Sequence, residues 1–359
     1  MEKTSESKIT DFRSSREGAR NIPDDNQVGE VIYLDKEKQK RKEKREAEIY
    51  EKYKSVFDFR EEKYAQDVEN KNSDNKISES ILKALQKHNK IVLSDGIDLI
   101  RGNNLSLEDG VAAIIATAMH DSGKLSSDVL SHHEKGIEYV DEMFLEMEEN
   151  DFEFEGVKLN DEIRQKIIWA IERHMNYPWL IRKNGGKKFP EPENIVDKVV
   201  YDADMLANIG FKNVAFRLSV EDNIQEDLME ARTGSSVIEE SFKNVMEDVV
   251  ILDGVVLTPL AKRMATKRID DVKKIFDYLK ENDIFENVQK EIIVSLKGLN
   301  SDPETEYEKD ENSLFVKLLF SGDKRSETVE IIKGRLDDEI KKAGMKLGIN
   351  WETIDKLTM

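Results

Sequence analysis

The stretch SLEDGVAAIIATAMHDSGK, residues 106–124, decides the fold because it joins a helix start, an apolar run and a polar ending. Its opening letters, SLEDG, are typical of a helix N-terminus. The run VAAIIATAM is almost wholly apolar, so we expect a helix buried in the middle of a bundle. His120 and Asp121 end this run, and Gly123 provides a break at which both side chains can turn toward one place.

The segments on both sides of this stretch also carry helical patterns. Upstream, ISESILKALQKHNKIVLSDGIDLI repeats apolar residues near helical spacing, and downstream NDEIRQKIIWAIERHM is amphipathic. The segment ENIVDKVVYDADMLANIG follows, with Gly210 where a helix C-terminal cap is expected. Strands do not alternate with helices, and β-branched runs are short. The sequence therefore predicts an all-α fold, a helical bundle.

Composition predicts three parts along the chain. Residues 1–75 are polar and dense in alternating charge, which indicates a charged N-terminal arm that begins disordered and continues as a solvated helix with a weak apolar seam. Residues 76–283 carry the helical patterns described above and form the expected core. Residues 284–359 are expected to form a helical C-terminal extension that packs back on this core or on a partner.

Bulk composition excludes several classes of function. The 359 residues include no cysteine, so any metal must be held by His, Asp and Glu rather than by thiolates. A formal net charge of −19 argues against general binding to nucleic-acid backbones, which needs a basic surface. No stretch approaches the roughly 18 uninterrupted apolar residues of a membrane helix, and the N-terminus lacks the apolar core of a signal peptide. We therefore expect a cytoplasmic protein with no membrane partner.

The histidines are concentrated in one part of the chain. All five lie between residues 88 and 174, in the same region as Asp121, and two further aspartates follow in the segment YDADMLAN. A hard or borderline divalent metal takes imidazole and carboxylate ligands that several helices project into one bundle core. His120 and Asp121 alone have a plainer interpretation, as a helix-terminal pair satisfied by backbone groups. Their neighbourhood favours a metal site.

This arrangement resembles the HD-domain metal-dependent phosphohydrolase superfamily, whose pattern is H…HD…D. HNKIV is similar to the segment of the first histidine, and AIIATAMHDSGK to the helix with its HD-x-G-K ending. HHEKGIEYVDEM looks like the H-x-x-x-G segment, and VVYDADMLANIGF like the segment of the last aspartate. The similarity covers roughly residues 77–283 and is nearest to small stand-alone bacterial HD hydrolases. It implies the HD-domain helical bundle.

The resemblance implies a set of histidine and aspartate ligands for one or two divalent ions, which would be Mn, Mg, Fe, Co or Zn. Its members are His88, His120, Asp121, His132, His174 and Asp204. Two choices stay open, because His133 competes with His132 and Asp202 with Asp204. The x-x-x-G spacing favours His132, and the family's usual A-D-x-L pattern favours Asp204. In a two-metal site, Asp121 would bridge the ions.

The reaction that the resemblance implies is attack of metal-activated water on a phosphate ester or anhydride, as in a phosphatase, pyrophosphatase or phosphodiesterase. The expected substrate is a small phosphorylated molecule, such as a nucleotide. Asp121 and Lys124 are the candidate catalytic residues. Lys124 would stabilise phosphoryl charge or protonate the leaving group, unless it is a plain cation at a helix C-terminus. Arg173 and the cationic loop KNGGKKF are candidates for substrate binding, unless that loop is merely solvated.

Two other classes of function have the same ligand pattern. A diiron oxygenase can use the same ligand set, because ligand residues do not specify the metal or the chemistry. A regulatory or scaffold protein can retain the fold without the reaction, although the complete ligand set argues against this.

Overall fold

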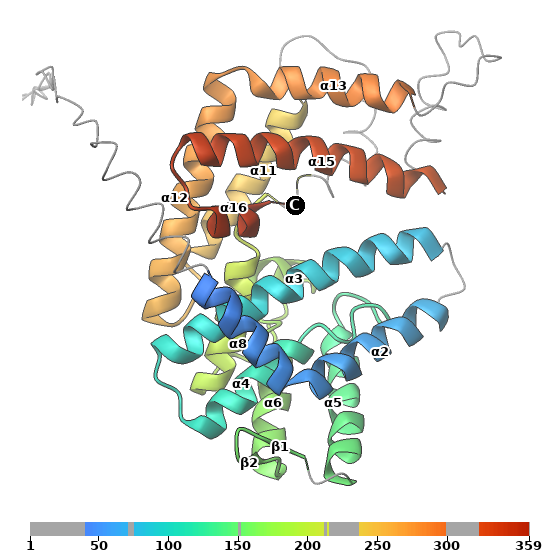
Figure 1. Ribbon diagram of the computed structural model, residues 1–359, viewed down its shortest axis with the longest axis vertical. Coiled ribbons are helices and arrows are strands. Elements are labelled where there is room, and N and C mark those ends of the chain that lie inside the picture. The colour runs from blue at the N-terminus through green and yellow to red at the C-terminus, as the bar shows by residue number, and fades with distance from the viewer. Residues whose placement is uncertain are drawn as a thin grey trace, which may run out of the picture. The chain divides into compact units, whose positions relative to one another are not determined.

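The computed structural model describes residues 40–70, 75–149, 152–211, 214, 237–298 and 323–358 (Figure 1). The chain divides into two units, Met1–Lys44 and Arg45–Met359. In the first unit, residues 40–44 are helical, and residues 1–39, the start of the predicted arm, lie outside the described residues. In the described part of the chain, no helix combines the length and apolar character that crossing a bilayer requires.

The second unit is built from helices, which confirms the predicted all-α class. They are α2 (Lys54–Asn70), α3 (Asn75–Gly102), α4 (Leu107–Met119), α5 (His132–Glu149), α6 (Asp161–Arg173), α7 (Pro178–Lys183), α8 (Ile195–Ala207), α11 (Val237–Leu252), α12 (Pro259–Glu281), α13 (Ile284–Gly298), α15 (Asp323–Lys346) and α16 (Trp351–Leu357). The sheet among the described residues is a small antiparallel hairpin, β1 (Glu153–Phe154) and β2 (Val157–Lys158). Its turn residues, Glu155 and Gly156, have φ values of 55° and 83°, as a two-residue type I′ turn requires.

Helix α4 is the centre of the packing, as its apolar run predicts. Ser106 caps its N-terminus by accepting a hydrogen bond from the backbone N–H of Asp109 at 3.1 Å. Every residue from Gly110 to Met119 is buried. The helix contacts α2, α3, α6 and α8, so the polar residues at its C-terminal end are buried among other helices.

Helix α2 differs from the expected solvated arm. Tyr53, just before the helix, and Val56, Phe57 and Tyr64 are buried, and the helix contacts α3, α4 and α5. The ring of Tyr53 stacks on Phe154 of the hairpin, with centroids 4.9 Å apart. The apolar seam is therefore a core face: burying its aromatic side chains outweighs the solvation of the charges around them.

The described part of the C-terminal extension packs back on the core. Helix α15 contacts α3, α12, α13 and α16, and in Figure 1 α3 lies between α4 and α15. The backbone N–H of Phe211, just after α8, donates to the carbonyl of Leu357 at 2.9 Å. A Cβ at Gly210 would lie 3.0 Å from the backbone of Leu357. The chain's last helix is thus seated closely against the end of α8.

Candidate metal centre

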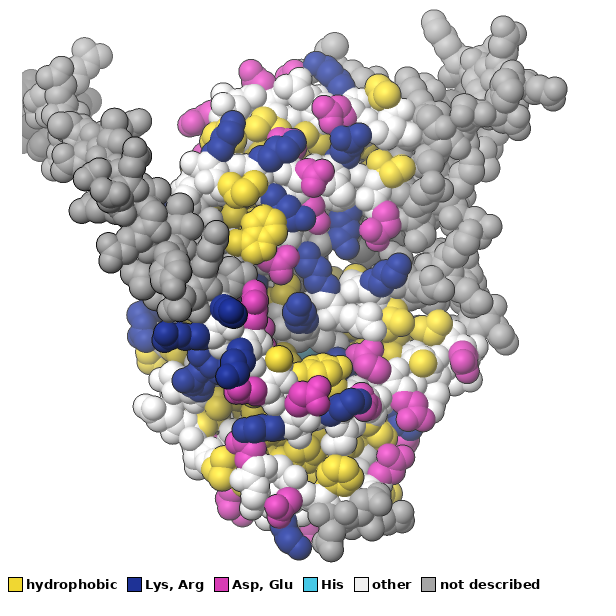
Figure 2. Space-filling model, viewed as in Figure 1, with side chains coloured by type: hydrophobic (Ala, Val, Ile, Leu, Met, Phe, Trp, Pro, Cys, Tyr) yellow, Lys and Arg dark blue, Asp and Glu magenta, His cyan; other side chains and the backbone are white. Residues whose placement is uncertain are grey.

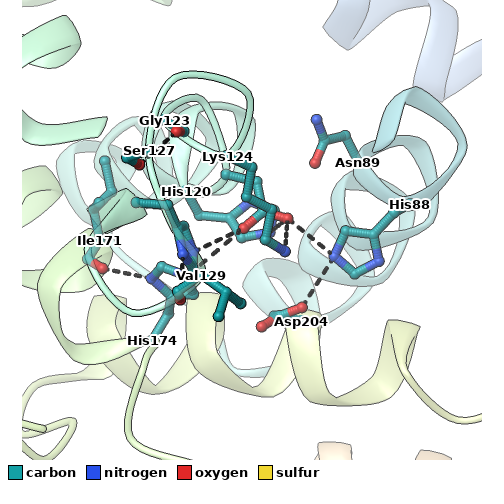
Figure 3. Close-up of polar contacts among 12 residues, drawn as sticks. His88, Asn89, His120, Gly123, Lys124, Ser127, Val129, Ile171, His174 and Asp204 are labelled. Carbon is teal, nitrogen blue, oxygen red and sulfur yellow. Dashed lines mark hydrogen bonds and ion pairs between the residues drawn. The ribbon is translucent and has the colours of Figure 1, made fainter. Parts of the chain in front are cut away.

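Five elements bring together the polar side chains at the end of α4. Figure 3 shows several of them pointing toward one another from different parts of the ribbon. The contributors are His88 of α3, His120 and Asp121 after α4, His132 at the start of α5, His174 at the end of α6 and Asp204 of α8. His120, Asp121, His132 and His174 are each at most 1% exposed, and on the face shown in Figure 2 histidine side chains scarcely reach the surface.

The end of α4 turns His120 and Asp121 toward the same space. The helix stops at Met119 and the chain continues in tight turns, with the N–H of Ser122 donating to the Met119 carbonyl at 2.9 Å and the N–H of Lys124 donating to the Asp121 carbonyl at 3.0 Å. On a continuing helix the two side chains would diverge by about 100°. Here Nε2 of His120 lies 3.3 Å from Oδ2 of Asp121.

Gly123 is required in this turn for space rather than for an unusual backbone angle. A Cβ on Gly123 would collide with the carbonyl oxygen of His132 and would lie 2.8 Å from the amide nitrogen of Gly136. Backbone atoms cannot move aside as a flexible side chain does. The glycine therefore lets the start of α5, with His132, approach the Asp121 turn closely.

We expect Gly123→Ala to lower the free energy of unfolding by about 1–3 kcal/mol, the usual cost of overpacking a fixed site. The matched control is Gly334→Ala on the exposed face of α15, where an added Cβ meets nothing within 4 Å. That change should stabilise the protein by up to about 1 kcal/mol, because alanine is the better helix former. Urea unfolding of both variants measures the two effects. Equal effects from the two substitutions would contradict the proposed crowding at Gly123.

Asp121 is the centre of the cluster, and each of its oxygens faces a different pair of histidines. Oδ2 lies 3.4 Å from Nε2 of His88 and 3.3 Å from Nε2 of His120. Oδ1 lies 3.3 Å from Nε2 of His132 and 3.8 Å from Nε2 of His174. Two groups of possible metal ligands result, and they share this one carboxylate.

The structure separates the two aspartates of YDADMLAN. Oδ1 of Asp204 lies 3.1 Å from Nε2 of His88, which places Asp204 in the cluster. Asp202 instead accepts hydrogen bonds from the backbone N–H groups of Leu257 and Thr258, at 2.7 and 2.8 Å. These donors lie at the N-terminus of α12, where unpaired N–H groups favour a carboxylate. Asp202 therefore joins α8 to α12.

The adjacent histidines also separate. His132 faces both Asp121 and His174, whose Nε2 lies 3.3 Å from its own. His133 points elsewhere, with its ring edge-on to Phe189 at 5.7 Å between centroids. Only His132 of this pair belongs to the groups that can hold a metal.

Backbone carbonyls hold three of the imidazoles in one orientation. In each, Nδ1 pairs with the carbonyl three residues earlier, at 2.9 Å for His120, 2.9 Å for His132 and 2.5 Å for His174. A carbonyl only accepts, so Nδ1 carries the proton and donates. In the neutral rings, Nε2 then presents its lone pair to the cluster, which is the tautomer of a metal-bound histidine.

The donor set fits a divalent cation. Among the described residues, Nε2 of His120 and Oδ1 of Asp121 are buried without a hydrogen-bond partner, and such atoms cost about 1–3 kcal/mol each unless something binds them. Burial and the charges of His120 and His132 lower the pKa of His174 to about 3, which keeps this ring neutral. Burial opposes ionisation of Asp121, but the charges of His120 and Lys124 outweigh it and lower its pKa. Burial opposes the charged form of His120, but the charge of Asp121 outweighs it and raises the pKa of His120. A cation would therefore bind there in exchange for a proton, because such a cation takes neutral imidazoles and ionised carboxylates as ligands.

The structure places Lys124 at the edge of the cluster. Its Nζ lies 2.5 Å from Oδ2 of Asp121, and its side chain is 32% exposed. Burial opposes the charged form of Lys124, but the charges of Asp121 and Asp204 outweigh it and raise its pKa. Lys124 is therefore charged at neutral pH, and it reaches from the solvent side toward the carboxylates.

Arg173 is held by other partners. Its guanidinium lies 2.6 Å from Oδ2 of Asp197 and 3.1 Å from Oε2 of Glu193, and it covers the ring of Trp169 at 5.3 Å. Asp197 also closes the capping box at the N-terminus of α8. These contacts join α6 to α8, and they do not support the predicted role of Arg173 in substrate binding.

Two residues at the site were not singled out from the sequence. The hydroxyl of Tyr64 in α2 donates to the Asp121 carbonyl at 3.3 Å, and Nδ2 of Asn89 donates to the same hydroxyl at 2.8 Å. Tyr64 lies in a segment dense in charge and far from Asp121 in sequence, so no local pattern marks it.

Comparisons with protein-family models, with curated proteins and with solved structures find no match to this chain. The interpretation of the buried histidine–aspartate cluster therefore rests on its geometry alone. That geometry shows a helical protein with a site that can bind metal.

Proposed function

We propose that this chain is a metal-dependent phosphohydrolase of the HD type, which cleaves an ester or anhydride bond in a small phosphorylated molecule such as a nucleotide. One observation carries the proposal: the two oxygens of Asp121 face separate pairs of imidazole Nε2 atoms. A carboxylate between two sets of ligands is suited to a pair of divalent ions, and paired ions clamp the attacking and leaving oxygens of a phosphoryl transfer.

The proposed metal ligands form two groups, one on each side of Asp121. On one side of Asp121, the ligands are His88, His120 and Asp204, and on the other side they are His132 and His174. Bound divalent ions lower the pKa of water toward neutrality and neutralise charge on the phosphoryl oxygens. Asp121 shares its charge between the two groups of ligands. The burial of the cluster strengthens its electrostatic interactions, because water screens them less there.

In the proposed reaction, Lys124 binds the phosphoryl group and can act as a proton donor. Its raised pKa keeps the ammonium charged at neutral pH, beside Asp121 and partly open to solvent. A fixed cation in that position attracts the phosphoryl group of an incoming substrate. It can also donate a proton to a strongly basic leaving oxygen.

The test is a panel of phosphatase, pyrophosphatase and phosphodiesterase substrates, assayed with Mn²⁺, Mg²⁺, Co²⁺, Zn²⁺ and, without oxygen, Fe²⁺. We expect at least one substrate to be hydrolysed, with activity removed by EDTA and restored by metal. The double variant His120→Ala/Asp121→Ala should be inactive, whereas His133→Ala, a histidine outside the cluster, should keep its activity.

Two results would contradict the proposal. A wild-type protein inactive on the whole panel with every metal would overturn the hydrolase function. Activity that survives in the double variant would instead overturn the assignment of the site. Iron-dependent oxygen uptake, measured on the same samples, would assign the cluster to a diiron oxygenase, the other enzyme class that these ligands suit.

A further inference from the structure

Helix α2 holds the backbone on both sides of His120. Nη1 of Arg60 donates to the carbonyl of Ala118 at 3.1 Å, one of the carbonyls that the end of α4 leaves without a partner inside its own helix. The hydroxyl of Tyr64, one turn further along α2, donates to the carbonyl of Asp121. Helix α2, which supplies none of the proposed metal ligands, therefore fixes the turn that carries His120 and Asp121.

The hydroxyl of Tyr64 also links two of the elements that carry ligands. It accepts a hydrogen bond from Nδ2 of Asn89, the residue after His88 on α3, which is drawn beside His88 in Figure 3. The side chain of Tyr64 is 0% exposed and Asn89 is 2% exposed, so water does not compete for these bonds. One buried oxygen thus connects the helix of His88 to the turn of Asp121.

The ring of Tyr64 has an ordinary packing role that its hydroxyl does not share. The ring packs with Leu85 and Leu125 in a small apolar cluster. The ring of a phenylalanine at position 64 would make the same apolar contacts. A buried hydroxyl costs free energy unless it is hydrogen-bonded, and here both of its bonds run to the two elements of the site. The neighbouring Tyr53 provides the contrast, because its buried hydroxyl has no hydrogen-bond partner among the described residues.

We propose that Tyr64 is a positioning residue of the metal centre, which sets the site's metal affinity by fixing the Asp121 turn relative to His88. Tyr64 acts through Asp121 and Asn89 and takes no part in the reaction itself. The inference rests on the metal centre of the proposed function but not on hydrolysis. It also makes the segment before residue 76, which the HD resemblance does not cover, part of the site.

The test compares Tyr64→Phe with Tyr53→Phe in the full chain. Each substitution removes one buried hydroxyl from the same part of the molecule and keeps the ring. Titration calorimetry with Mn²⁺ should show affinity about tenfold weaker for Tyr64→Phe, the lower end of what partners of metal ligands contribute. Tyr53→Phe should bind as the wild type does. Hydrogen exchange of residues 118–126 in metal-free protein should be faster in Tyr64→Phe alone.

The outcomes are distinct. Unchanged Mn²⁺ affinity in Tyr64→Phe, or equal losses in both variants, would overturn the positioning role and leave the proposed hydrolase standing. A wild type that binds Mn²⁺ without hydrolysing any phosphoester would overturn the proposed function, while the affinity comparison still decides the role of Tyr64. A wild type that binds no divalent metal at all would overturn both.

Discussion

In the proposed two-metal site, Asp121→Ala is expected to abolish binding of both ions, because this one carboxylate belongs to both groups of possible ligands. Each of its oxygens lies within 3.8 Å of two imidazole Nε2 atoms, and no other described carboxylate has this arrangement. Catalysis should fall by at least about 10²–10³-fold, the loss seen when a single electrostatic stabiliser of a transition state is removed. Metal analysis after equilibrium dialysis, with kcat measured on the same samples, checks both effects.

Matched variants separate loss of the bridge from general damage. The double variant His132→Ala/His174→Ala removes only the ligands facing Oδ1, so we expect it to retain one ion. His133→Ala should retain both ions, because His133 points toward Phe189. Two ions at full affinity in Asp121→Ala would contradict the bridging role.

Arg268→Met is expected to cost about 3–5 kcal/mol of the free energy of unfolding, the usual effect of removing one partner from a buried ion pair. Arg268 of α12 binds both oxygens of Asp95 of α3 and donates to the carbonyl of Leu206 at 2.8 Å. Lys356 of α16 joins the same carboxylate at 2.7 Å. Asp95 is fully buried, so the substitution leaves much of its charge uncompensated.

Urea unfolding at neutral pH measures this loss, and Lys274→Met on the same helix is the control. Lys274 pairs with Asp271 at 3.4 Å with its side chain 61% exposed, and such pairs contribute less than about 1 kcal/mol. Equal losses in the two variants would show that Arg268 acts through general properties of α12 and not through Asp95.

The pH dependence of this network has a definite sign. Burial opposes ionisation of Asp95, but the charges of Arg268 and Lys356 outweigh it and hold its pKa below the ordinary value. A depressed pKa stabilises the folded state above the unfolded pKa of about 3.9, and this contribution is lost as the pH falls further. The difference in stability between wild type and Arg268→Met should therefore shrink when unfolding is measured at pH 3 instead of pH 7.

Features that depend on neighbours along the chain were predictable. The apolar run before His120 required a helix buried on all sides, and α4 is that helix. Gly123 was correctly singled out as special, but the reason is the collision its Cβ would make with α5, which no local pattern contains. The buried face of α2 was not predicted, because alternating charge along a sequence does not show which side chains point toward the core.

Choices between adjacent or nearby residues were open in the sequence, although the family pattern favoured His132 over His133 and Asp204 over Asp202. The packing of α5 and α8 shows that His132 faces Asp121 and that Asp204 lies against His88. The role of Arg173 in substrate binding stays a prediction, and the sequence did not show that Asp197 and Glu193 meet its guanidinium.

By itself, the sequence determined that this protein is helical, that any metal must be held by imidazole and carboxylate groups, and which short segments supply them. The helical class and the kinds of ligand follow from residue types and from periodicity along one helix, whereas the choice of segments is what the resemblance to HD hydrolases implies. The tertiary structure alone decided that Asp121 stands between two groups of histidines and that Tyr64 joins the elements around it. Such contacts join residues far apart in the chain, and their distances depend on how whole helices pack, which no local stretch of sequence encodes.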